Sequence, residues 1–131
     1  MTNRQDALII GIDSGTSVVK AVAFSLDGEQ IAVASRPNRY TLAHDGVATQ
    51  DMNQTWTDCV AVLRQLAGMI PDLAGRAAAI AVTAQGDGTW LVGRDNQPVG
   101  EAWLWLDARA SGTVRELRSG PAERARYVTT G

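Results

Sequence analysis

The chain opens with three short β-prone segments in succession, and this opening most strongly limits the folds available to it. Residues 7–12 are a continuously apolar run of strand length, and a second β-rich run covers 18–26. Asp27-Gly28, a dipeptide typical of tight hairpin turns, separates it from a third run over 29–35, which Pro37 ends. This order predicts a three-stranded antiparallel meander rather than a dinucleotide-binding βαβ unit, whose first strand would lead into a helix.

A helix is expected after the meander, followed by a second buried strand. Residues 38–52 are polar and are expected to be irregular, and Asn53 is the expected N-cap of a helix that Pro71 stops. Residues 77–83 form another continuously apolar run, which predicts a strand buried on both faces. Helical spacing is shared by Trp56, Cys59, Val60, Leu63, Leu66, Ala67 and Ile70. The remaining expected elements are strands over 89–92 and 102–106 and helices over 109–118 and 122–128.

Charge and cysteine content argue against several classes of partner. The net charge is -2 and Lys20 is the only lysine, so a nucleic-acid partner is not expected. The arginines over 109–126 alternate with glutamates, which favours a solvated helical face. Cys59, the single cysteine, has apolar helix neighbours and is expected in the core rather than as a nucleophile. No apolar run approaches the ~20 residues needed to cross a bilayer, so a cytoplasmic protein without a membrane partner is expected.

The first candidate site directly follows the opening strand. Asp13 at the end of a buried strand can hold a hydrated Mg²⁺ ion. A turn at Gly15 exposes backbone N–H groups, and the hydroxyls of Thr16 and Ser17 add donors for phosphate oxygens. Lys20 can supply a cation unless strand alternation points it elsewhere. The structural alternative is a tight hairpin turn with a solvent-facing lysine.

A second candidate site follows the apolar run over 77–83. The segment Ala84-Gln85-Gly86-Asp87-Gly88 begins where the carboxyl end of a strand faces the ligand crevice of an open α/β sheet. Gln85 and Asp87 provide an amide and a carboxylate for hydroxyl recognition. The alternative is a Gly-Asp-Gly turn with a solvated carboxylate.

The third candidate segment is rich in tryptophan. In Trp103-Leu104-Trp105-Leu106-Asp107-Ala108-Arg109, strand alternation would place Trp103, Trp105 and Asp107 on one face. Indole faces pack on the C–H groups of polyols, and a carboxylate accepts hydrogen bonds from their hydroxyls. The alternative makes Asp107 a helix N-cap and both tryptophans core residues.

These segments resemble, in order and spacing, the motifs of the FGGY carbohydrate kinases, the family of glycerol kinase, xylulokinase and gluconokinase. The stretch 11–24 resembles the family's first phosphate-binding motif, in which the aspartate matching Asp13 helps organise Mg²⁺–ATP. The stretch 84–88 resembles the substrate-contacting segment, and 103–109 resembles the W-x-D-x-R segment. Gly86 stands where glycerol kinase has an arginine, which disfavours glycerol as substrate. QGDGTWLVG and WLWLDAR are most similar to erythritol-kinase-like members.

One further segment departs from the family pattern. Gln50-Asp51-Met52 followed by Trp56 resembles the E-x-D-P…W segment, with two departures: Gln50 directly precedes Asp51, and Met52 replaces the usual proline. The residues themselves favour structural roles, with Asp51 interacting with the helix dipole and Trp56 anchoring the core.

The resemblance implies a ribonuclease-H-like α/β domain with a mixed sheet, as in actin, heat-shock ATPases and sugar kinases. Residues 1–131 would form the N-terminal part of its first domain, which binds phosphate and substrate. The implied ligands are ATP, Mg²⁺ and a small sugar or sugar alcohol, with phosphate and metal contacts from Asp13 and the turn after it. The general base and the second domain would lie outside this chain, which alone would be inactive. A non-catalytic nucleotide-binding or scaffold module and self-association remain open alternatives.

Overall fold

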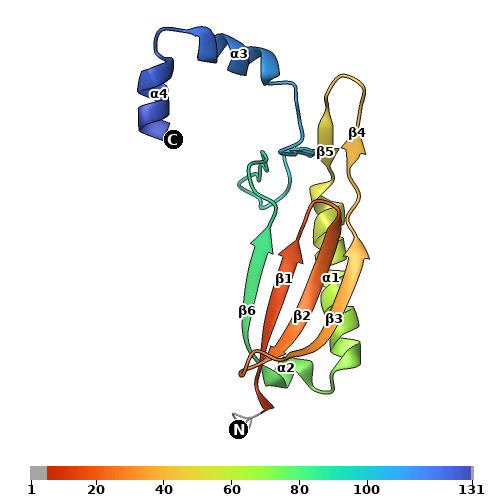
Figure 1. The fold of residues 1–131 in the computed structure, drawn as a ribbon. Helices are drawn as coiled ribbons and strands as arrows, with labels where there is room; N and C mark the ends of the chain where they lie inside the picture. Colours follow the sequence, from red (N-terminus) through yellow and green to blue (C-terminus); the bar gives the residue numbers. More distant parts are fainter. Residues whose placement is uncertain (1–5, 131) are drawn as a thin grey trace.

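The computed structural model describes residues 6–130, which form an α/β architecture around a four-stranded mixed sheet (Figure 1). The sheet order is β3-β2-β1-β6. Its strands are β1 (Leu8–Ser14), β2 (Val18–Ser25), β3 (Gln30–Pro37) and β6 (Ala77–Ala84). The pairs β1–β2 and β2–β3 are antiparallel and β1–β6 is parallel, so the predicted meander and mixed sheet are confirmed.

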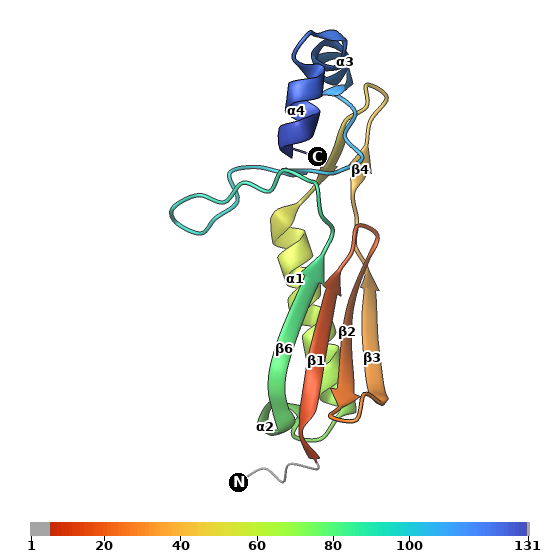
Figure 2. The same ribbon diagram turned by 60° about the vertical axis from the view of Figure 1, so that its left-hand side comes forward.

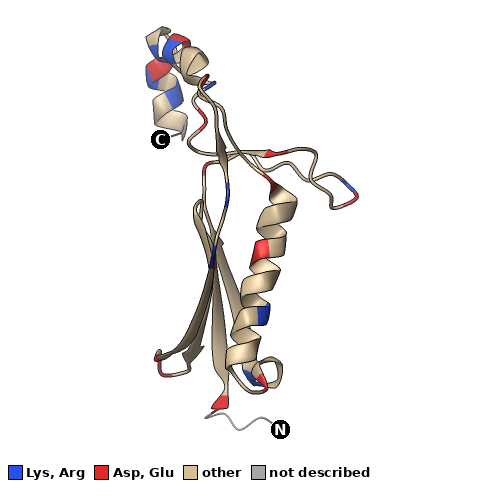
Figure 3. Cartoon of the chain, turned by 90° about the vertical axis from the view of Figure 1, so that its right-hand side faces the viewer, with Lys and Arg blue, Asp and Glu red and all other residues tan. Residues whose placement is uncertain are grey.

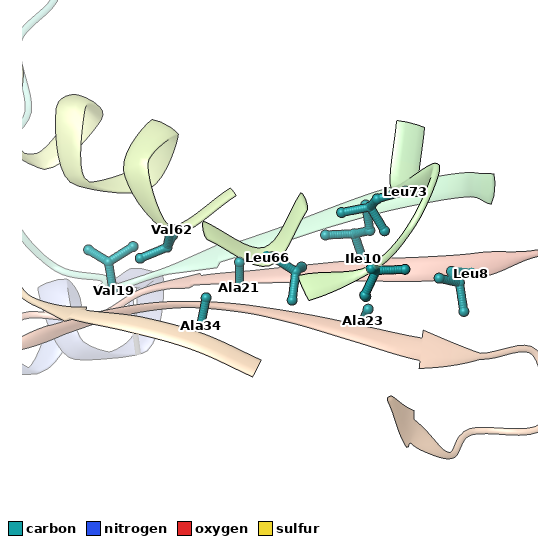
Figure 4. Packing of buried hydrophobic residues seen from close by; sticks show 10 residues of the cluster. Leu8, Ile10, Val19, Ala21, Ala23, Ala34, Val62, Leu66 and Leu73 are labelled. Carbon is teal, nitrogen blue, oxygen red and sulfur yellow. The ribbon is translucent and has the colours of Figure 1, made fainter. Parts of the chain in front are cut away.

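Strand alternation directs one face of the sheet toward helix α1 (Met52–Met69). In β1, Leu8 and Ile10 are buried beneath the helix while Ile9 between them is partly exposed on the other face. Val62 and Leu66 of α1 are fully buried against the small residues of β2 and β3, as Figure 4 shows. Burying one such leucine contributes about 1.5–3 kcal/mol. The core therefore forms a single layer between α1 and one face of the sheet.

Helix α1 is capped by Asp51, not by Asn53 as predicted. Asp51 Oδ1 accepts hydrogen bonds from the N–H groups of Asn53 at 2.8 Å and Gln54 at 3.1 Å. Its backbone is extended, whereas Asn53 already lies within the helix. The structural role expected for Asp51 is thus confirmed, through direct capping. The helix ends at Met69, just before Pro71 as predicted, and no helix within 6–130 is long and apolar enough to span a membrane.

The segment 38–52 is more ordered than predicted. It contains β4 (Thr41–Leu42) and β5 (Ala48–Gln50), which form a second sheet of order β4-β5-β7 with β7 (Ala102–Trp103). The strand predicted over 102–106 is correspondingly short, because the chain turns at Asp107, whose N–H bonds to Leu104 O at 2.9 Å. The strand predicted over 89–92 is reduced to two isolated bridges.

Three further helices complete the described chain. They are α2 (Leu73–Arg76), α3 (Ser111–Ser119) and α4 (Glu123–Thr130). The last two confirm the helices predicted near the C-terminus, and α2 is a single turn that was not predicted. Figure 3 shows several charged residues on α3 and α4, away from the four-stranded sheet. All residues of α3 are exposed, as a solvated face requires.

Two predictions of burial are wrong. Strand β6 lies at the edge of the sheet, with Ile80 58% and Val82 68% exposed, instead of being buried on both faces (Figure 2). Trp56 was expected to anchor the core, yet it is 71% exposed. The physical reason is the same for both, since α1 packs mainly on β2 and β3 and leaves β6 uncovered within the described residues.

One carboxylate fastens the segment after β7 to β5. Asp107 Oδ2 accepts a hydrogen bond from Ala48 N–H at 3.0 Å, and Arg109 Nη2 donates to the same oxygen at 2.8 Å. The Arg109 guanidinium lies over the Trp103 ring, 4.2 Å from its centroid. Hydrogen bonds from the Arg109 side chain, and to a smaller extent from the Ala48 N–H, hold the pKa of the Asp107 carboxyl well below its usual range. Asp107 is therefore a link between β5 and the chain after β7. It does not cap α3, whose N-cap is Ala110.

We expect Asp107→Asn to lower the Tm of the chain at neutral pH, because it keeps the shape of the side chain and removes its charge. A lowered native pKa means that the carboxylate stabilises the fold above its ordinary pKa of about 3.9, and that this effect is lost as the pH falls through the native pKa. The Tm deficit of the variant should therefore shrink below about pH 4. Circular dichroism melts across the pH range measure it, with Asp27→Asn in the exposed β2–β3 turn as control. A deficit of constant size at all pH values would contradict the ionic origin.

Candidate functional site

The predicted phosphate and substrate segments meet at one end of the sheet. Strands β1 and β6 run parallel, with Ser14 in register with Ala84, so the carboxyl ends of both strands lie at the same end of the sheet (Figure 1). Gln85 N–H donates to Ser14 O at 3.1 Å, which continues the pairing one residue beyond β6. The turn after β1 and the loop after β6 are therefore neighbours.

The turn between β1 and β2 has all its carbonyl oxygens held inside the protein. Asn38 Nδ2 donates to Gly15 O at 2.8 Å, and Asn38 N–H donates to Ser17 O at 2.8 Å. Gln50 Nε2 donates to Thr16 O at 3.1 Å. Asn38 is 3% exposed and Gln50 is 1% exposed, so both side-chain amides are buried and bind protein groups rather than solvent. The three consecutive carbonyls are thus turned away from any ligand.

The N–H groups of the same turn are left available. Gly15 N–H closes the turn on Val18 O at 3.1 Å, but within residues 6–130 the N–H groups of Thr16 and Ser17 have no protein acceptor. A Cβ on Gly15 would lie 3.0 Å from Val18 O, so glycine lets the turn close tightly. Successive unpaired N–H groups in a turn form a concave anion site.

Asp13 and Lys20 lie directly opposite one another across β1 and β2. Both line a shallow hollow on the face of the sheet away from α1, together with Phe24 and Thr83. The half-buried Asp13 carboxylate has no hydrogen bond or ion pair to any described residue, and no group of three metal-ligating side chains occurs in the described part of the chain. A lone carboxylate suits Mg²⁺, which keeps several waters and takes its other ligands from phosphates. The donor set therefore fits Mg²⁺.

A chain of side-chain hydrogen bonds connects the turn to the substrate segments. Thr16 Oγ1 donates to Gln85 Oε1 at 2.8 Å and accepts from Trp105 Nε1 at 3.1 Å. Gln85 Nε2 donates to Gln50 Oε1 at 2.6 Å. Three predicted site residues, Thr16, Gln85 and Trp105, are therefore in direct contact. The Thr16 hydroxyl was expected to donate to phosphate, but its proton is engaged by Gln85.

The two candidate substrate carboxylates differ in their availability. Asp87 is exposed, forms no hydrogen bond with the described residues and has a positive φ of 59°, which aspartate tolerates better than most residues. Asp107 Oδ1 accepts from the N–H and Nε of Arg109, and Oδ2 is held by Ala48 N–H and Arg109. A carboxylate has about four acceptor positions. Asp107 thus has no acceptor left for a polyol, whereas both oxygens of Asp87 are available.

Two residues that organise the site were missed from the sequence. Asn38 falls in a segment expected to be irregular, and Gln50 was noted only as a departure from a motif. Each acts by donating to carbonyl oxygens that are distant along the chain, including Arg39 O at 3.0 Å from Gln50 Nε2. Their polar character in a segment expected to be irregular was the available signal, and it does not indicate which carbonyl oxygens the two side chains contact.

Comparisons with known proteins agree with this architecture. The chain is 59% identical to the erythritol kinase of Brucella abortus over 124 residues. This alignment covers 95% of this chain and 24% of that protein. It is 32% identical to the L-xylulose/3-keto-L-gulonate kinase of Escherichia coli, over 92% of this chain and 24% of that protein. The crystal structure of xylulose kinase from Rhodospirillum rubrum has a TM-score of 0.80 at 29% identity, over 91% of this chain and 25% of that one.

The chain spans about a quarter of the length of these relatives. The sugar-kinase fold expected from the sequence is confirmed by the structural match. Residues 8–131 match the N-terminal domain of the FGGY family of carbohydrate kinases, which is nearly the whole chain. This protein therefore belongs to the FGGY family of carbohydrate kinases.

Proposed function

We propose that this chain supplies the phosphate- and substrate-binding part of an ATP-dependent kinase acting on a hydroxyl of a small sugar or sugar alcohol. Residues 1–131 would be the N-terminal part of its first domain, in a cytoplasmic enzyme. The observation that carries the proposal is the 2.8 Å hydrogen bond between Thr16 in the phosphate turn and Gln85 in the substrate loop. Phosphoryl transfer depends on holding the acceptor hydroxyl beside the γ-phosphate, and this contact joins the two binding segments.

Phosphate binding would use the β1–β2 turn together with the side chains of Asp13 and Lys20. The unpaired N–H groups of Thr16 and Ser17 suit the oxygens of a phosphate, with Gly15 keeping the turn tight. Asp13 would hold Mg²⁺ through its free carboxylate, and Lys20 beside it would add positive charge. The metal ion would neutralise charge on the phosphates.

The polyol end would use Gln85, Asp87 and Trp105. The free carboxylate of Asp87 can accept hydroxyl hydrogen bonds. The N–H of Trp105 is engaged by Thr16, so its 57% exposed indole would offer its face to C–H groups. Asp107 would join only after releasing Arg109. The 59% identity to an erythritol kinase supports an erythritol-like polyol as the favoured substrate.

Proton removal from the attacking hydroxyl would be done by a base outside this chain. A coupled ADP-release assay tests the function, using the full-length protein that carries this chain and a panel of polyols and sugars of three to six carbons. We expect polyol-dependent ADP release, highest with a four-carbon polyol, and none from the 131-residue chain alone. ATP binding without any polyol- or sugar-dependent release would instead support a non-catalytic nucleotide-binding module.

Asp13→Asn should reduce kcat of the full-length protein on the order of 10²-fold, because it removes a preorganised charge that would hold Mg²⁺. The Mg²⁺ concentration needed for half-maximal rate should rise as well. Steady-state kinetics over a Mg²⁺ titration measure both effects, with Asp27→Asn in the exposed β2–β3 turn as the charge-matched control. Near-wild-type turnover at saturating Mg²⁺ would contradict the metal role.

Asp87→Asn should lower kcat/KM for the polyol by ~10- to 150-fold, because a hydrogen bond to a charged group is worth about 1.5–3 kcal/mol. The KM for ATP should stay nearly constant. Asp95→Asn is the matched control, since Asp95 lies in the next loop and, among residues 6–130, its side chain accepts a hydrogen bond only from Gln97 N–H, at 3.1 Å. Equal changes in the polyol and ATP constants would show that Asp87 is not a substrate ligand.

A further inference from the structure

Gln50 is the first residue of a chain of side-chain hydrogen bonds. In each bond of this chain, the neighbouring groups decide which atom donates and which accepts. The chain runs from Gln50 through Gln85 and Thr16 to Trp105. It connects β5, the loop after β6, the β1–β2 turn and the segment after β7. These four segments are far apart in sequence, so the chain exists only in the folded protein.

The orientation of the Gln50 amide is fixed by two backbone carbonyls. Its Nε2 lies 3.1 Å from Thr16 O and 3.0 Å from Arg39 O, and both of these oxygens can only accept. Rotating the amide by half a turn would place its oxygen against two carbonyl oxygens in a side chain that is 1% exposed. Leaving buried polar groups unsatisfied destabilises the fold, so this flip is strongly disfavoured.

The fixed orientation of Gln50 determines that of Gln85. Gln50 Oε1 faces Gln85 at 2.6 Å and can only accept, so Gln85 must present its Nε2 there. Gln85 Oε1 then faces Thr16, whose hydroxyl must donate to it. Trp105 Nε1–H can only donate, and it fills an acceptor position on the Thr16 oxygen. One N–H of Gln85 is left without an acceptor among the described residues.

We propose that Gln50 is a positioning residue that fixes the Gln85 amide so that it offers a donor, rather than an acceptor, to the substrate. The inference rests on the proposed kinase function, and it adds which group donates a hydrogen bond to the polyol and which group accepts one. Gln85 then donates to a hydroxyl oxygen of the polyol, and the exposed Asp87 carboxylate is the acceptor for a hydroxyl proton. Because Gln50 also holds Thr16 O, it connects this polarity to the geometry of the phosphate turn.

Double-mutant kinetics on the full-length protein test this role. Gln85→Leu should raise the polyol KM several-fold and leave the ATP KM unchanged, since a neutral hydrogen bond of about 0.5–1.5 kcal/mol corresponds to a factor of ~2 to 13. Gln50→Leu should raise both constants. The double variant should show the polyol KM of Gln85→Leu alone, because Gln50 acts on the polyol only through Gln85. Polyol effects that simply add would overturn the proposal.

Gln65→Leu is the matched control, because Gln65 is an exposed residue of α1 with no side-chain hydrogen bond to the described residues. It should leave both constants unchanged. If Gln50→Leu does not fold, Thr16→Val and Thr16→Ser replace it. The valine removes the hydroxyl that holds Gln85 Oε1 and should raise the polyol KM, whereas serine restores the hydroxyl and should rescue it. An equal polyol KM in these two variants would also overturn the proposal.

A spectroscopic measurement separates this inference from the proposed function. The indole N–H resonance of Trp105, assigned with Trp105→Phe, reports the bond to Thr16 without any turnover. It should shift in Gln50→Leu and Thr16→Val but not in Gln65→Leu. An unshifted resonance in both of the first two variants overturns the hydrogen-bond chain. If Gln50→Leu and Thr16→Val shift the resonance but the wild-type protein phosphorylates no polyol or sugar, the hydrogen-bond chain stands and the kinase function is overturned, and with it the role of Gln50 toward a substrate.

Discussion

The site depends on how the protein satisfies the three carbonyl oxygens of residues 15–17. A buried carbonyl without a donor is costly, so a turn at the end of a core strand must either expose its carbonyls or find partners for them. Asn38 and Gln50 provide those partners from the segments after β3 and in β5. With the carbonyls held inside, the opposite side of the turn is left with N–H groups. The polarity of the candidate phosphate site follows from this arrangement.

The same constraint explains the small second sheet. Strands β4, β5 and β7 are two or three residues long and bury little surface of their own, but β5 carries Gln50 into contact with Thr16 and Gln85. Pairing of β7 with β5, reinforced by Asp107 and its partners, brings Trp105 to the same place. The second sheet therefore holds Gln50 and Trp105 in position beside the turn.

Several features were predictable because they depend on short-range periodicity. The apolar and β-prone runs on either side of Asp27-Gly28 predicted the meander, and helical spacing up to Ile70 predicted the helix. The partners of each segment were less predictable, since they depend on contacts between residues far apart in the chain. Asp51 and Asn53 are both good capping residues, and only the path of the backbone decided between them. Burial of β6 and Trp56 was overestimated because an apolar pattern does not reveal which neighbour covers it.

The sequence by itself determined the opening meander, the long helix with the apolar strand after it, and the resemblance to sugar kinases, because local patterns and motif spacing carry that information. Only the tertiary structure decided which polar atoms remain available to a ligand. It engages the Asp107 carboxylate with Arg109 and the Thr16 hydroxyl with Gln85, while the Asp87 and Asp13 carboxylates form no hydrogen bond or ion pair with the described residues. The physical reason is that a hydrogen-bonding group is free or engaged according to its neighbours in space. Those neighbours are 34 to 89 residues away along the chain in the bonds that connect Thr16 to Gln50, Gln85 and Trp105.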